Sequence, residues 1–427
     1  MRILHTSDWH LGRTLHGVDL LEHQAAIVDH LVEHVVERSV DVVVVAGDVY
    51  DRAVPSVPSV RLLGRALRRL SEHAVVVVTP VNHDSAVRLG FAAELMRPGL
   101  HVLASVERLA EPVVVHDEHG PVAFYGLPYL EPDTARHTLA EPPAAPGSTR
   151  ASASAGPTDP SAGPTDPSAG EARVGPDAPP PVREPLARSH EAVVSAALRR
   201  VRGDLAARPG TRSVVVAHAF VSGGAVSDSE RDIRVGGVDS VPSGVFAGVD
   251  YVALGHLHGA QRVGPARDVR PVLRYSGSPL AFSFGEVGHV KSTALVDLAA
   301  DGSVEVELVP TPVPRRLAEV TDTLEHLLDG RHDHLVDAWL RVSVTDPVHP
   351  DRLYARVKER FPHALVVLHT PVGAVDQPRL RVVTAETDPV EVAADFVAFA
   401  SGGPASEPEL AALRHAYEQA RASEASA

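Results

Sequence analysis

The pattern of hydrophobic and polar residues in the first third of the chain alternates between strands and helices. Residues 41–46 and 74–78 are short runs dominated by valine, which predict strands buried on both faces. Residues 20–37 and 60–70 instead carry apolar side chains at the spacing of an amphipathic helix. Strands that alternate with helices in this way predict an α/β fold with a parallel-rich sheet covered by helices.

The composition changes abruptly over about residues 140–188. This segment is dominated by Pro, Ala, Gly and Ser, and residues 154–160 are repeated immediately as residues 161–167. A seven-residue unit is too short for a solenoid, and the segment has almost nothing apolar to bury. We therefore expect a disordered surface insert.

Ordered patterns resume after this insert. A helix is predicted near residues 190–208, and strands are predicted over residues 213–217, 251–254, 272–275 and 293–297. The prolines of residues 310–314 then suggest a domain boundary. Beyond them, a strand (338–344), a helix (350–361) and a strand (364–369) predict a small α+β domain. We expect a first domain over residues 1–310, a small capping domain over 311–400, and a tail over 401–427 with a short helix near 408–422.

Composition limits the classes of function. The 427 residues are 44% apolar and carry a net charge of −15, which argues against binding nucleic acid through bulk positive charge. Nucleic acid could still bind locally at metal ions or with a partner subunit. The chain has no Cys, so any metal must be held by His, Asp, Asn or Glu, which suits Mn²⁺, Mg²⁺, Fe²⁺ or Zn²⁺. Because no secretory or membrane-spanning pattern is present, we expect a cytoplasmic protein.

Five predicted strands are each followed by residues of the types that bind metal ions. In chain order these residues are Asp8 and His10, Asp48, Asn82 and His83, His218, and His256 with His258. Open α/β sheets place their ligand sites at the carboxyl ends of strands. Any one of these short motifs alone is weak evidence, but all five in order predict a metal centre.

Each residue type has a chemical reason to be there. Alternate residues of an extended loop lie on the same side, so Asp8 with His10, and His256 with His258, could each present two ligands. The two oxygens of Asp48 could bridge two divalent ions about 3.5–4 Å apart. Such a pair of ions can hold a phosphate and lower the pKa of a water molecule for attack on phosphorus.

The motifs resemble the calcineurin-like metallophosphoesterase superfamily and, within it, the SbcD-type nuclease subunits, relatives of the Mre nucleases. The narrower resemblance rests on residues 7–12, 46–51, 229–237, 250–258 and 275–279. It implies a β-sandwich flanked by helices with a small α+β capping domain. It also implies one metal at Asp8, His10, Asp48 and His258, and a second at Asp48, Asn82, His218 and His256. His83 would be the catalytic histidine, supported by Asp51.

The same resemblance implies two Mn²⁺ ions, DNA ends and hairpins as substrates, and a role in DNA repair and recombination. The activities would be 3′→5′ exonuclease action on duplexes and endonuclease action on hairpins and single strands. The partner would be an SbcC-type coiled-coil ATPase, with two copies of each subunit. A homodimer would form through helices over residues 60–70 and 85–96.

The sequence departs from the family at Val81, where a glycine usually precedes Asn82. A β-branched residue would be strained at positive φ, so we expect the loop to accept Val81 in a β conformation. Two other functions stay open. One is a phosphoprotein or nucleotide phosphatase of the same superfamily, and the other is a non-catalytic DNA-end scaffold.

Overall fold

The computed structural model describes residues 1–81, 89–90, 96, 98–140, 184–228, 230, 240–264, 270–372, 388–401 and 405–424. The chain divides into two compact units, Met1–Ala318 and Glu319–Ala427, and each is described by itself. The division falls shortly after the boundary predicted at residue 310. Most of the predicted insert, Asn82, His83 and most of the helix expected over residues 85–96 lie outside the described residues.

The first unit contains a six-stranded sheet in the order β14-β13-β1-β4-β5-β6. Its strands are β1 (Arg2–Thr6), β4 (Val42–Val45), β5 (Val75–Val78), β6 (Leu100–Val102), β13 (Ser292–Leu298) and β14 (Val304–Pro310). β1, β4, β5 and β6 run parallel to one another, while β13 and β14 are added antiparallel. A short hairpin of β2 (Thr14–Leu15) and β3 (Val18–Asp19) follows β1.

A second six-stranded sheet has the order β11-β12-β10-β9-β8-β7. Its strands are β7 (Val113–Asp117), β8 (Gly120–Leu127), β9 (Arg212–His218), β10 (Tyr251–Gly255), β11 (Gln261–Val263) and β12 (Val272–Tyr275). β8, β9, β10 and β12 are parallel, and the two edge strands β7 and β11 are antiparallel to their neighbours.

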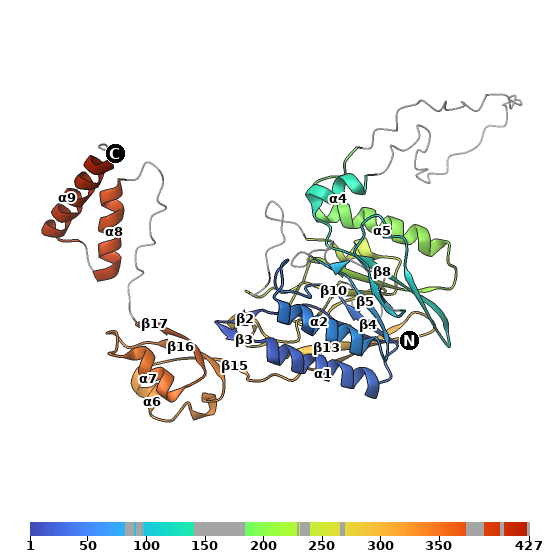
Figure 1. Cartoon of the computed structure of the whole chain (residues 1–427), viewed down its shortest axis with the longest axis horizontal. Helices are drawn as coiled ribbons and strands as arrows, with labels where there is room; N and C mark the ends of the chain where they lie inside the picture. Colours follow the sequence, from blue (N-terminus) through green and yellow to red (C-terminus); the bar gives the residue numbers. More distant parts are fainter. Residues whose placement is uncertain are drawn as a thin grey trace, which may run out of the picture. The chain divides into compact units, whose positions relative to one another are not determined.

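The two sheets form a sandwich around a shared apolar core. Side chains such as Val44 of the first sheet and Phe124 and Val216 of the second belong to one buried cluster. A second cluster lies on the other face of the second sheet, where α4 (Pro132–Thr138) and α5 (His190–Ala206) pack. Helices α1 (Leu21–Glu37) and α2 (Val57–Leu70) lie side by side along the first sheet (Figure 1).

This architecture confirms the predicted fold class, a calcineurin-like β-sandwich flanked by helices, and corrects one detail. The five ligand-bearing strands were expected at one open sheet edge. Instead β1, β4 and β5 belong to the first sheet, and β9 and β10 belong to the second. β13 pairs with the side of β1 opposite β4, so neither β9 nor β10 is a neighbour of β1.

The second unit is built on a three-stranded sheet of β15 (Leu317–Asp322), β16 (Trp339–Val344) and β17 (Ala364–His369). β16 and β17 are parallel and are joined by α7 (Leu353–Arg360), while α6 (Leu324–Leu328) follows β15. Two further helices, α8 (Pro389–Ser401) and α9 (Glu407–Glu424), complete the described part of the unit. None of the described helices is long and apolar enough to cross a membrane.

Candidate metal centre

Two loops of the first sheet carry Asp8, His10 and Asp48, and backbone hydrogen bonds tie them together. The Asp8 N–H donates to the Gly47 carbonyl (3.0 Å), and the His10 N–H donates to the Asp48 carbonyl (2.8 Å). All three ligand-type residues have positive φ values of 44–54°. The loop after β1 therefore turns at these residues, whereas the sequence analysis assumed that it was extended. The side chains of Asp8 and His10 converge because the backbone turns at both residues.

The second sheet brings His218, His256 and His258 to the same place. The His256 N–H donates to both carboxylate oxygens of Asp8, at 3.1 and 3.2 Å. His218 contacts the Ala46 carbonyl through Nδ1 (3.1 Å). The two sheets approach so closely here that a Cβ on Gly255 would lie 1.9 Å from the same carbonyl oxygen. Only glycine fits between the sheets at this point.

These residues form two groups whose ligand atoms lie within 4.8 Å of one another. The first group is Asp8, His10 and His258, and the second is Asp8, Asp48 and His218. The Asp48 carboxylate connects them, because its Oδ2 lies 3.6 Å from His10 Nε2 and 3.4 Å from His218 Nε2. All five side chains are buried. Asp48 thus lies between the two groups, and the assignment of ligands to individual ions stays a prediction.

The donor set suits divalent cations. It combines two carboxylates with three imidazoles, and none of the ligand atoms is soft. Burial raises the pKa of Asp8 to about 6, although contacts with His258 and Ser7 oppose this change. A buried carboxylate is costly in its charged form unless a cation lies beside it. A metal ion bound to Asp8 would supply this charge, so the residues present fit the two-metal site that the fold family implies.

The structure places the other predicted residues as follows. The His256 ring lies 5.3 Å from the His218 ring, beside the second group. Asp51 lies 3.8 Å from His10 Nδ1 and 3.8 Å from Arg13 Nε, at the edge of the first group. Asn82 and His83 lie outside the described residues, so their roles and the predicted contact between Asp51 and His83 stay predictions.

Several residues that support the centre were missed from the sequence. Glu286 and Lys291 lie buried behind His258, and the Phe282 ring packs against both His10 and His258, with centroids 5.2 and 5.5 Å apart. These residues follow β12 in a segment with no ligand-like motif. The only signal was the match of residues 275–279 to the resemblance.

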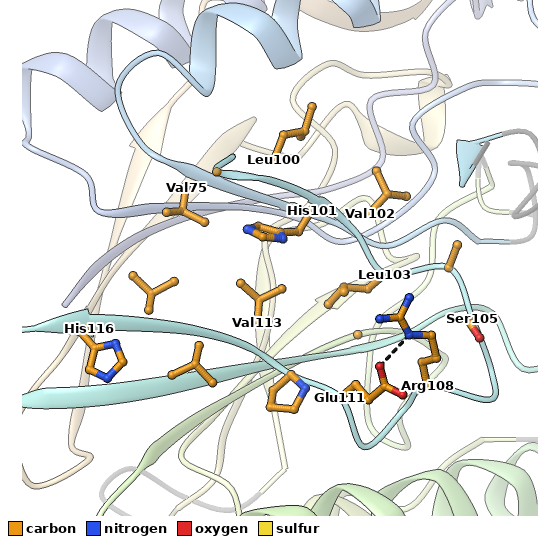
Figure 2. A pocket seen from close by; sticks show the side chains of 16 residues that line it. Val75, Leu100, His101, Val102, Leu103, Ser105, Arg108, Glu111, Val113 and His116 are labelled. Atoms are coloured by element: carbon orange, nitrogen blue, oxygen red, sulfur yellow. Dashed lines mark hydrogen bonds and ion pairs between the residues drawn. The ribbon is translucent and has the colours of Figure 1, made fainter. Parts of the chain in front are cut away.

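A separate cavity opens between the edge strands β6 and β7 (Figure 2). It has a volume of about 710 Å³ and is lined mainly by apolar residues of the two strands, with His101, His116, and the ion pair of Arg108 and Glu111 (2.7 Å) among its polar lining. None of the residues of the two ligand groups lines it. The cavity is therefore distinct from the candidate metal centre.

Comparison with known proteins gives matches in both units. The calcineurin-like phosphoesterase family matches residues 1–138. The SbcD C-terminal family, described as type 5 capsule protein repressor C-terminal domain, matches residues 312–400. A solved structure, TT1561 of Thermus thermophilus, aligns over 72% of this chain and 98% of its own, with 14% identity and a TM-score of 0.36.

Residues 1–138 therefore carry a calcineurin-like phosphoesterase domain, which makes the protein a hydrolase of a family that binds divalent metals. The presence of the SbcD-type C-terminal domain in the same chain supports an SbcD-type subunit.

Proposed function

We propose that the chain is a two-metal DNA phosphodiesterase acting at DNA ends. It degrades duplexes in the 3′→5′ direction and cuts hairpins and single strands, in DNA repair and recombination. The observation that carries the chemistry is the pair of ligand groups that share Asp8 and are connected by Asp48. The pairing of a phosphoesterase domain with an SbcD-type C-terminal domain favours DNA over other phosphate esters.

The residues of the site divide the work. Two divalent ions, which we propose to be Mn²⁺, supply Lewis acidity to the phosphate and lower the pKa of water when they are bound. Asp8, His10, Asp48 and His258 would hold one ion, and Asp48, Asn82, His218 and His256 would hold the other. His83 would donate a proton to the leaving oxygen or stabilise the charge that develops on the phosphate.

The test uses purified protein with Mn²⁺ on end-labelled duplex and hairpin DNA. We expect cleavage by the wild type and by His116→Ala, because His116 is exposed, lines the separate cavity and belongs to neither ligand group. Asp48→Asn and His83→Ala should each lower the rate at least a hundredfold. Brisk hydrolysis of a phosphopeptide or cyclic nucleotide without DNA cleavage would overturn the nuclease assignment. Full activity of His83→Ala would overturn the role of that residue alone.

We propose further that the partner is an SbcC-type coiled-coil ATPase, with two copies of each subunit, and that the chain itself dimerises through α2 and residues 85–96. An apolar strip at the start of α2 supports this contact, because Val54, Val57 and Val60 are 71%, 63% and 47% exposed. Exposed valines that recur at every third position are compatible with an interaction surface. Val57→Asp should shift the protein from dimer to monomer in light scattering. Val348→Asp, at a valine of the second unit that is 78% exposed, should leave the dimer intact.

A further inference from the structure

His258 is held from two sides by carboxylates that the metal centre does not use. Its backbone N–H donates to Glu230 Oε1 at 2.8 Å. Its ring Nδ1 lies 3.4 Å from Glu286 Oε1. The opposite ring atom, Nε2, faces His10 Nε2 at 3.2 Å. The ring is therefore oriented with Nδ1 toward a carboxylate and Nε2 toward the first ligand group.

Glu286 is itself fixed in place. Its side chain is completely buried, and Oε1 also accepts a hydrogen bond from the Phe282 N–H (3.0 Å). Its other oxygen, Oε2, forms an ion pair with Lys291. The Lys291 ammonium and the Phe282 N–H together keep this carboxylate in place beside the ring of His258. Glu286 thus presents a charged acceptor to the ring of His258.

Lys291 completes the arrangement with a nearly buried ammonium group, 3% exposed. Its Nζ donates to the His258 carbonyl (3.1 Å), to Ser278 Oγ (2.9 Å) and to Glu286 Oε2. A lysine has three N–H donors, and each finds one acceptor here. The planar guanidinium of an arginine carries five donors and would leave some of them unpaired in this enclosed space. This requirement explains why position 291 is a lysine, although only two of the 40 lysines and arginines in the chain are lysines.

We propose that Glu286 and Lys291 are positioning residues of the metal centre. Glu286 keeps the proton of the His258 imidazole on Nδ1, which leaves the Nε2 lone pair directed at the metal. Lys291 fixes Glu286 and, through the His258 carbonyl, the backbone that carries the ring. A carboxylate on the far nitrogen of a metal-binding histidine fixes the tautomer and raises the basicity of the ligand. This inference rests on the proposed metal centre and assigns a task to two residues outside it.

The experiment measures Mn²⁺ binding by calorimetry, independently of any DNA cleavage. Glu286→Gln alone would leave the buried Lys291 unpaired and could fail to fold. The informative variant is therefore Glu286→Gln with Lys291→Met, which removes both charges at similar volume. We expect it to fold, as judged by circular dichroism, and to bind Mn²⁺ at the first site 10–100-fold more weakly than the wild type. Lys291→Arg, with Glu286 intact, should also bind Mn²⁺ more weakly than the wild type.

A matched control removes a comparable ion pair far from the ligand groups. Arg212 and Asp117 are 5% and 12% exposed and pair with each other in the second sheet. Arg212→Met with Asp117→Asn should lower stability but leave Mn²⁺ affinity unchanged. Wild-type Mn²⁺ affinity in the folded Glu286/Lys291 variant would overturn the proposal, as would an equal loss of affinity in the control. If the wild type binds Mn²⁺ and the variant binds it weakly, but neither cleaves DNA, the positioning role stands and the nuclease assignment falls. A wild type that binds no divalent ion would overturn both.

Discussion

Replacing Gly47 with alanine tests how the two sheets are fitted together at the metal centre. Gly47 precedes Asp48 and has a φ of +86°. A Cβ at this position would lie 2.4 Å from Cγ1 and 2.7 Å from Cγ2 of Val81, and 2.8 Å from Nδ1 of His218. All three distances are far shorter than van der Waals contacts. The substitution should therefore displace both Val81 and a ligand-type histidine.

The magnitude has a conformational part and a steric part. A left-handed backbone costs a residue with a Cβ about 1–2 kcal/mol, and overlap in a packed interior costs roughly 1–3 kcal/mol more. Alanine also lowers the conformational entropy of the unfolded chain, which offsets about 0.4–1 kcal/mol of this destabilisation. We therefore expect Gly47→Ala to lower the free energy of unfolding by about 1–5 kcal/mol. Mn²⁺ affinity should fall as well, because His218 moves.

A matched control separates the two parts. Gly17 has nearly the same φ, +88°, but nothing lies within 4 Å of an added Cβ. Gly17→Ala should therefore cost only about 1 kcal/mol, from backbone strain alone. Adding Val81→Ala to Gly47→Ala removes two of the three clashes and should restore part of the lost stability, but not the position of His218.

The assay uses urea denaturation followed by tryptophan fluorescence. The chain has two tryptophans, Trp9 in the first unit and Trp339 in the second. In a Trp339→Phe background the signal comes from Trp9 alone, which is buried in the loop that carries Asp8 and His10. Equal losses of stability in Gly47→Ala and Gly17→Ala would refute the steric argument. An unchanged Mn²⁺ affinity in Gly47→Ala would refute the predicted shift of His218.

Three further outcomes follow from the same contacts. The Arg13 guanidinium lies 5.0 Å from the Phe282 ring at the edge of the centre. With DNA as the proposed substrate, this cation would contact a backbone phosphate, so Arg13→Met should raise KM about tenfold, equivalent to 1.4 kcal/mol, with little change in kcat in steady-state cleavage assays. Addition of EDTA should lower the melting temperature of the wild type more than that of Asp48→Asn, because ions bound only by the folded protein stabilise it. Hydrogen bonds from Arg208 lower the pKa of Asp204 in the folded protein. The charged Asp204 therefore stabilises the fold above its unfolded pKa near 4, and this stabilisation is lost as the pH falls. Asp204→Asn should lower the urea midpoint at pH 7 but have a diminishing effect below pH 4.

Much of the fold could be predicted because its central strands and long helices carry strong periodic patterns. The prediction over residues 20–37 corresponds to α1 (Leu21–Glu37), and that over residues 41–46 corresponds to β4 (Val42–Val45). The strand β8 was missed because Pro121 and Gly126 interrupt its apolar run and lower its strand propensity. The division of the strands between two sheets could not be read from periodicity, because a strand buried between two layers has the same apolar pattern in either sheet.

The candidate site could be predicted as far as its ligands have characteristic types and follow strands. Asp8, His10, Asp48, His218 and His258 were all chosen on this basis, and the structure brings them within two groups. Glu286 and Lys291 could not be chosen, since nothing in the local sequence distinguishes a buried carboxylate behind a histidine from a solvated one. Their task depends on the contact of residues far apart along the chain, which only the folded structure specifies.

The backbone strain of the protein is concentrated where its ligands are. Of the seven non-glycine residues with positive φ in the described part of the chain, four are Asp8, His10, Asp48 and His256. Aspartate and histidine tolerate this conformation better than most residues, yet each still carries a cost of order 1 kcal/mol. Hydrogen bonds offset this cost, because the Asp8 and His10 N–H groups donate to the neighbouring loop and the His256 N–H donates to Asp8 itself. The same turns that strain the backbone aim the side chains at one point, so relaxing the strain would disperse the ligands. The left-handed residues are thus part of the metal centre in the same sense as the side chains they carry.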